Sequence, residues 1–195
     1  MKFKIISFYT IGTGYENEIK SLIQSLDKLN VPYDIRWIND LGNWEDNAKQ
    51  KPVFIRNMLN IADEQALVWL DADSVVLSYP DIFNHINTDA AFYFRTTGAN
   101  AKRLGGYELI TATMYFANND RARVLLDMWI AEETKISQPE QCLIEQRALQ
   151  RIINQWQAQH HGTITYLPQS YCRIFDALED DRVILQNQAS RKFRR

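Results

Sequence analysis

The segment Ala66–Phe83, ALVWLDADSVVLSYPDIF, decides how this chain is expected to fold. Its first five residues are apolar, and two carboxylates, Asp71 and Asp73, follow with only Ala72 between them. Charged groups at the end of a buried strand are costly unless they are paired or bind a cation. Side chains at i and i+2 of an extended segment point to the same side, so both acids can face one site. The segment therefore predicts a buried strand that ends at a functional site.

Strand and helix patterns alternate on both sides of this segment. Hydrophobic periodicity predicts strands at 3–8, 33–38, 66–70, 90–95, 109–117, 163–168 and 182–186. The predicted helices are 18–29, a segment with Pro52 in its first turn, 122–133 and 140–156, and residues 96–108 read as a polar loop. This order predicts an α/β fold over residues 1–195, a single domain with an open, mainly parallel sheet flanked by helices. Ligands of such sheets bind beyond the carboxyl ends of the strands, where the two aspartates lie.

Composition narrows the class of protein. The chain has 195 residues, of which 46% are hydrophobic, so it can bury one sizeable core. A formal charge of -2 gives no general attraction to nucleic acid, although the C-terminal SRKFRR is basic. No window reaches the ~18 consecutive apolar residues of a membrane span. Cys142 and Cys172 lack metal-ligand spacing and are expected to be reduced thiols. We expect a cytoplasmic protein, free or peripheral to the inner membrane surface.

The Asp-Ala-Asp pattern predicts a divalent cation bound together with a diphosphate. Mg²⁺ and Mn²⁺ prefer oxygen ligands, and Mg²⁺ is often held by one or two carboxylates with substrate phosphates and water. Two acids are sufficient if the substrate carries a diphosphate. The same segment also matches the hhhhDxDx(T/V) run of haloacid dehalogenase-like phosphatases, with Asp71 as nucleophile. In that alternative Lys102 is the lysine and Asp180 and Asp181 are the late acidic pair, although the phosphatase motif usually lies on the first strand.

The chain resembles GT-A glycosyltransferases, particularly the retaining glycogenin and lipopolysaccharide galactosyltransferase type and related small bacterial and phage enzymes. The resemblance is carried, in the family's order, by VWLDADSVVLSYPDIF, LITATMYFANN, EQRAL and YLPQSYCRIFD. It implies a GT-A fold and Mn²⁺- or Mg²⁺-dependent transfer of a hexose-like sugar from a nucleoside-diphosphate donor, with UDP as the expected nucleotide. The implied acceptor is a glycan, a lipid-linked glycan or another small acceptor, and a nucleic-acid acceptor reached by the basic tail stays open.

The resemblance also implies roles for individual residues. The implied metal ligands are Asp71, Asp73 and Gln186, the last standing where the family has a histidine. A glutamine carbonyl is an acceptable ligand for a hard cation. The implied catalytic residues are Glu145 and Gln146 beside the anomeric carbon, with Asp71 sharing the metal or holding the ribose. The residues expected to bind the donor are Tyr9, Thr10, Thr13, Lys51, Arg191 and Lys192.

Several alternatives remain open at this point. Retention is favoured by the resemblance, but an inverting enzyme would need a carboxylate base, for which Glu108, Glu145 and Asp176 are candidates. Trp44 is either a packing residue or a platform for the base. A haloacid dehalogenase-like phosphatase and a non-catalytic nucleotide-sugar-binding protein are the two alternative functions.

Overall fold

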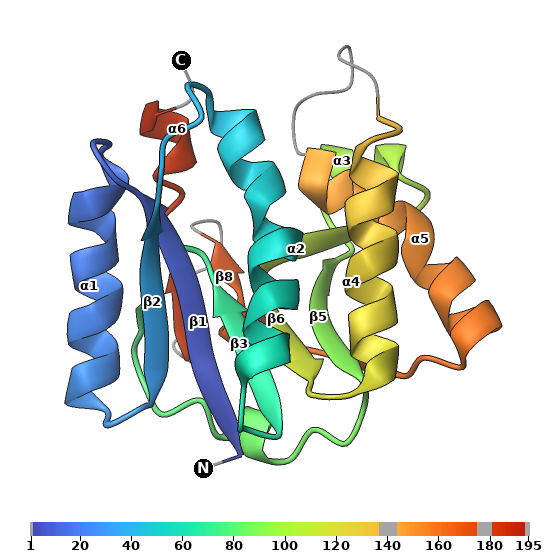
Figure 1. The fold of residues 1–195 in the computed structure, drawn as a ribbon, viewed down its shortest axis with the longest axis horizontal. Helices are drawn as coiled ribbons and strands as arrows, with labels where there is room; N and C mark the ends of the chain where they lie inside the picture. The colour runs from blue at the N-terminus through green and yellow to red at the C-terminus, as the bar shows by residue number, and fades with distance from the viewer. Residues whose placement is uncertain (1, 137–143, 175–180, 194–195) are drawn as a thin grey trace.

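A six-stranded sheet forms the centre of the protein in the computed structural model, which describes residues 2–136, 144–174 and 181–193 (Figure 1). Its strands lie in the order β2-β1-β3-β6-β5-β7. The strands are β1 (Phe3–Thr10), β2 (Tyr33–Ile38), β3 (Ala66–Leu70), β5 (Ala90–Arg95), β6 (Glu108–Ala117) and β7 (Ile164–Tyr166). The prediction of an open, mainly parallel sheet flanked by helices is confirmed.

Helices and a second sheet complete the fold. The helices are α1 (Tyr15–Lys28), α2 (Trp44–Ile61), α3 (Ala99–Arg103), α4 (Asp120–Glu133), α5 (Ile144–His160) and α6 (Ser190–Phe193). The small sheet has the order β4-β9-β8, formed by β4 (Ser74–Val76), β9 (Ile184–Gln186) and β8 (Arg173–Ile174). The short 3-10 helices η1 (Asp81–Asn84) and η3 (Gln169–Tyr171) lie in connecting segments.

The core lies on both faces of the central sheet because strand side chains alternate. From β3, Leu67 and Trp69 pack with α2, α4 and α5 on one face, whereas Val68 and Leu70 pack with α1 and β4 on the other. All five residues of β3 are buried. A strand covered on both faces reads as a continuous apolar run, which is why ALVWL shows no alternation.

Strand direction differs from the expectation in one place. β1 pairs in parallel with both β2 and β3, and β5 pairs in parallel with β7. β6 runs antiparallel to both of its neighbours, β3 and β5. Hydrophobic periodicity reports which residues face the core and carries no information on the direction of a strand, so it could not predict this reversal.

The prediction that Pro52 lies in the first turn of a helix is wrong. Helix α2 begins at Trp44, where the Asn43 side chain accepts a hydrogen bond of 2.9 Å from the Asp46 N–H, and Pro52 lies inside it. The asparagine cap and two acidic residues in the first turn start the helix earlier than the proline suggests. A proline at this position cannot donate to the Ala48 carbonyl, and Ala48 lines the pocket described below.

The structure refines one further expectation. The sequence predicts a polar loop at 96–108, but this segment contains helix α3, and its last residue, Glu108, begins β6.

Cys172 is a buried free thiol whose pKa is raised to about 12 by burial, whereas Cys142 lies outside the described residues. The predicted start of the helix at residue 140 also lies outside them. No helix within 2–136, 144–174 and 181–193 is long and apolar enough to cross a membrane.

Candidate active site

A pocket of about 310 Å³ opens at the edge of the sheet where β1, β3 and β5 end. Its walls come from these strands, from β6, from helices α2 and α5, and from the segment after β9. The predicted site residues that line it are Tyr9, Thr10, Lys51, Asp71, Asp73, Glu145, Gln146, Gln186 and Arg191. Residues far apart in the sequence are therefore brought together at the strand ends, as expected for an α/β sheet.

Two of the predicted donor-binding residues do not line this pocket. The Thr13 hydroxyl donates to the Thr10 carbonyl at 2.8 Å and lies within the turn before α1. The Lys192 ammonium lies 3.3 Å from the Glu18 carboxylate on α1. Sequence position places both residues near the site, but the local turn and helix geometry direct their side chains to other partners.

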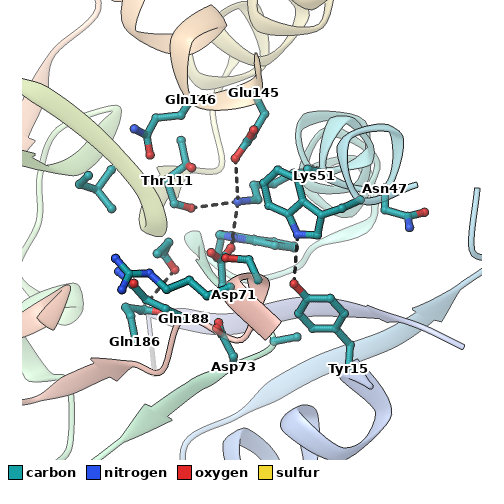
Figure 2. Close-up of a pocket in the computed structure, with 18 of the residues that line it drawn as sticks. Tyr15, Asn47, Lys51, Asp71, Asp73, Thr111, Glu145, Gln146, Gln186 and Gln188 are labelled. Atoms are coloured by element: carbon teal, nitrogen blue, oxygen red, sulfur yellow. Dashed lines mark hydrogen bonds and ion pairs between the residues drawn. The ribbon is translucent and has the colours of Figure 1, made fainter. Parts of the chain in front are cut away.

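Lys51 occupies the centre of the polar wall. Figure 2 shows its ammonium group between Asp71 and Glu145, at 2.9 Å and 3.9 Å respectively. It also donates to the Thr111 carbonyl at 3.4 Å and lies 5.4 Å from the centre of the Trp69 ring. Burial would lower the pKa of Lys51, but the Asp71 and Glu145 carboxylates outweigh burial and raise its pKa above the ordinary value. Lys51 is therefore a buried, charged group that links α2, β3 and α5.

Asp71 is held by the residues around it. Its Oδ1 atom accepts from the Trp69 indole N–H at 2.8 Å and pairs with Lys51, and its backbone N–H donates to the Ala112 carbonyl at 3.0 Å. Its Oδ2 atom accepts no hydrogen bond from the described residues. The side chain is one-third exposed, so Asp71 keeps one oxygen available at the pocket.

Asp73 connects the pocket to the C-terminal segment. Its Oδ2 atom accepts from the Ala189 N–H at 2.5 Å, and its carbonyl accepts from the Asn187 N–H at 3.2 Å. Burial, and after it the nearby Asp71 carboxylate, raises the pKa of Asp73 to about 6. The same segment carries Gln188 and Arg191 to the pocket, so Asp73 helps to build the wall opposite Lys51 (Figure 2).

Gln186 lies beside the two aspartates but is already hydrogen-bonded. Its Oε1 atom accepts from the Ser74 hydroxyl at 2.7 Å, and its Nε2 atom donates to the Thr113 hydroxyl at 3.0 Å. A carbonyl oxygen has two lone pairs, so a second bond from Oε1 is still chemically available. Its role as a metal ligand stays a prediction.

The aspartates have the chemistry of a site for a hard divalent cation. The Asp71 carboxylate raises the pKa of Asp73 because the two negative charges repel each other. A cation between them would relieve that repulsion. Within residues 2–136, 144–174 and 181–193, no group of three or more His, Cys, Asp or Glu side chains is arranged to hold a metal. A cation at Asp71 and Asp73 would therefore need oxygen ligands from a substrate and from water.

Sequence reasoning missed several residues of this pocket. They are Tyr15, Asn47, Trp69, Asn100, Gln188 and Arg95. Arg95 ends the predicted strand 90–95, so the rule that singled out Asp71 also applies to it. Tyr15 accepts a 3.0 Å hydrogen bond from the Trp44 indole N–H, and both aromatic side chains line the pocket. Whether Trp44 contacts a base stays a prediction.

Of the residues assigned to the phosphatase alternative that the structure describes, only Asp71 lines the pocket. Lys102 is exposed on α3, Asp181 is exposed, and neither lines the pocket, whereas Asp180 lies outside the described residues. Among the candidate bases, Asp176 lies outside the described residues as well. Glu108 is buried and forms four hydrogen bonds, whereas Glu145 lines the pocket beside Lys51.

Glu133, at the end of α4, predicts a pH dependence of folding stability. The side chain is 7% exposed, its Oε1 atom has no hydrogen-bond partner among the described residues, and burial, with Glu145, raises its pKa to about 8. Lys51 and Lys49 act in the opposite direction. Because the folded pKa exceeds the unfolded one, the folded state binds more protons and stability falls as the pH rises from about 4.5 to 8.

We expect Glu133→Gln to remove a decline of about 4 kcal/mol in the free energy of unfolding between these pH values. Urea denaturation of both proteins at intervals from pH 5 to pH 9 measures it. Parallel stability curves for the two proteins across this range would contradict the assignment to Glu133.

No protein-family profile and no curated protein sequence matches the chain. Solved structures do match it. A glycosyltransferase involved in the glycosylation of the major capsid of PBCV-1 is 11% identical, with a TM-score of 0.66 over 96% of this chain and 93% of that one. The glycosyltransferase GlyE of Streptococcus pneumoniae TIGR4 is 13% identical, with a TM-score of 0.62 over 95% of this chain and 54% of GlyE. The chain thus spans about half the length of GlyE.

These similarities establish the fold. The central sheet with its flanking helices is a fold that these two solved glycosyltransferases share.

Proposed function

We propose that the protein transfers a sugar from a nucleoside diphosphate, with UDP as the expected nucleotide, to an acceptor. The observation that carries the proposal is the placement of Asp71 and Asp73 at the carboxyl edge of the sheet, in one pocket with Glu145 and Gln146. The shared fold of two glycosyltransferases supports it. The acceptor classes expected from the resemblance, a glycan, a lipid-linked glycan or another small acceptor, are part of this proposal.

Each group has a defined task in the proposed reaction. Asp71 and Asp73 would hold Mn²⁺ or Mg²⁺, with Gln186 as a third ligand. A cation bound there would supply positive charge that stabilises the departing nucleoside diphosphate. Arg191, on the segment that Asp73 anchors, adds positive charge on the same side. Tyr9 and Thr10 border the nucleoside at the end of β1.

Glu145 is the group we place beside the anomeric carbon. It is 4% exposed, lines the pocket, and its backbone carbonyl accepts a 2.7 Å hydrogen bond from the Trp129 indole, which fixes the start of α5. A carboxylate at this position stabilises positive charge on the sugar ring as the bond to the phosphate breaks. Retention of configuration, favoured by the resemblance, is part of the proposal.

Release of UDP from UDP-sugars tests the proposal without knowledge of the acceptor, because water can take the place of the acceptor in the reaction. UDP-glucose, UDP-galactose and UDP-N-acetylglucosamine are incubated with the protein and Mn²⁺, Mg²⁺ or a chelator. We expect release with at least one donor, and only with a metal. Hydrolysis of p-nitrophenyl phosphate without any release of UDP from UDP-sugars would favour the phosphatase. Binding of a UDP-sugar without release of UDP would favour the non-catalytic nucleotide-sugar-binding protein.

A further inference from the structure

Glu108 is a buried carboxylate that lines the same pocket as Glu145. The side chain is 2% exposed and both oxygens are used. Oε2 accepts from the Arg95 guanidinium, with Nε at 3.1 Å and Nη2 closer. Oε1 accepts from the Asn100 amide and from the Gln146 amide, each at 3.0 Å. One carboxylate thus joins β5, α3 and α5 to the first residue of β6.

All four members of this cluster line the pocket. Glu108 and Arg95 are directly opposite each other in the β5–β6 ladder, so the sheet itself brings the acid and the guanidinium together. Gln146 follows Glu145, which lies beside Lys51, and Lys51 in turn donates to Thr111 on β6. Glu108 and Thr111 are about 10 Å apart along the strand. The cluster and the Lys51 site therefore form adjacent parts of one wall.

The carboxylate determines how the neighbouring amides are oriented. An ionised carboxylate only accepts hydrogen bonds, so Gln146 and Asn100 must both present their NH₂ groups to Glu108. Their carbonyl oxygens are then directed away from it. The Asn100 carbonyl accepts from Arg103 at 3.3 Å, whereas the Gln146 Oε1 atom accepts no hydrogen bond from the described residues. Gln146 thus offers a fixed acceptor at the pocket.

We propose that this cluster is the subsite for the sugar of the donor and that Glu108 is its positioning residue. The inference rests on the proposed function. The Gln146 amide oxygen is held in one orientation, and a sugar hydroxyl has one O–H to donate to it. The direction of this hydrogen bond then determines which hydroxyl of the sugar can form it. A carboxylate cannot donate to the Gln146 Oε1 acceptor, so the subsite selects an uncharged sugar over a uronic acid.

Calorimetric titration of UDP and of UDP-sugars in Mn²⁺ tests this subsite. The wild-type protein is expected to bind UDP-glucose, UDP-galactose or UDP-N-acetylglucosamine more tightly than UDP, and UDP-glucuronate more weakly than the best of these. Glu108→Gln puts an NH₂ group among four donors and frees Gln146 to rotate. We expect it to lower the affinity for the best UDP-sugar about tenfold, the value of one lost hydrogen bond, with UDP affinity unchanged within twofold.

Two further variants keep the test decisive. Gln146→Met retains the shape and removes the acceptor, so it should show the same selective loss even if Glu108→Gln folds poorly. Asp89→Asn is the matched control, because Asp89 is a buried acid paired with Arg121 before β5, at the opposite end of that strand. It should leave both affinities unchanged.

Three results would overturn the subsite. They are equal loss of UDP and UDP-sugar affinity in Gln146→Met, an unchanged UDP-sugar preference in both variants, and a wild-type protein that binds no UDP-sugar more tightly than UDP. Tighter binding of UDP-glucuronate than of every neutral sugar would overturn the selection for an uncharged sugar. Absence of UDP binding to the wild-type protein would instead overturn the proposed function, and this subsite with it.

Discussion

Replacing Asp73 with asparagine is expected to reduce metal-dependent release of UDP from a UDP-sugar by about 10²–10³-fold. The carboxylate is expected to bind the cation that stabilises the leaving diphosphate, and losing one such electrostatic contact has effects of this size. Asparagine suits the test better than alanine. Its carbonyl still accepts from the Ala189 N–H, so the C-terminal segment with Gln188 and Arg191 stays attached.

The Asp73→Asn measurement is the rate of UDP release across a Mn²⁺ titration. Asp89→Asn serves as control, since it removes a buried negative charge outside the pocket and should retain the wild-type rate. Wild-type activity and wild-type Mn²⁺ dependence in Asp73→Asn would remove this residue from the metal site.

Lys51→Met is expected to impair both folding and turnover. It leaves Glu145, which is buried, and Asp71, which is one-third exposed, without their shared cation, and removing one partner of a buried ion pair costs about 3–5 kcal/mol. We expect the free energy of unfolding to fall by about 3 kcal/mol because Asp71 keeps some solvent. Turnover should fall about 100-fold, since Asp71 and Glu145 lose their positions.

Lys49→Met is the matched control for Lys51. Lys49 lies on the same helix, pairs with Asp46 at 2.9 Å and is one-third exposed, so its loss should change stability by less than about 1 kcal/mol. Urea denaturation and UDP release at saturating donor measure both effects. Equal behaviour of the two lysine variants would contradict the central position assigned to Lys51.

The strand and its acids could be predicted because the information is local. An apolar run that ends in two carboxylates at i and i+2 identifies β3 and places Asp71 and Asp73 at its end. The helix pattern of α5 likewise carries Glu145 and Gln146 to the same pocket. These positions depend on secondary structure and on the general location of ligand sites in α/β sheets.

Other features depend on contacts between distant segments. Glu108 forms its cluster with residues 8, 13 and 38 positions away, and nothing in the sequence near it specifies those partners. The antiparallel direction of β6 likewise depends on its pairing with the distant strand β3 and with β5. Thr13 and Lys192 do not line the pocket, because turn and helix geometry, rather than sequence position, decides which way a neighbouring side chain points.

Calorimetric titration of UDP into the wild-type protein, with Mn²⁺ and then with a chelator, tests the central claim most directly. We predict binding with Mn²⁺ and a loss of at least tenfold in affinity when the metal is removed, because the diphosphate and the two aspartates share the cation. Absence of UDP binding under both conditions would contradict the assignment of this pocket to a UDP-sugar. Binding of equal strength with and without the metal would contradict the role given to Asp71 and Asp73.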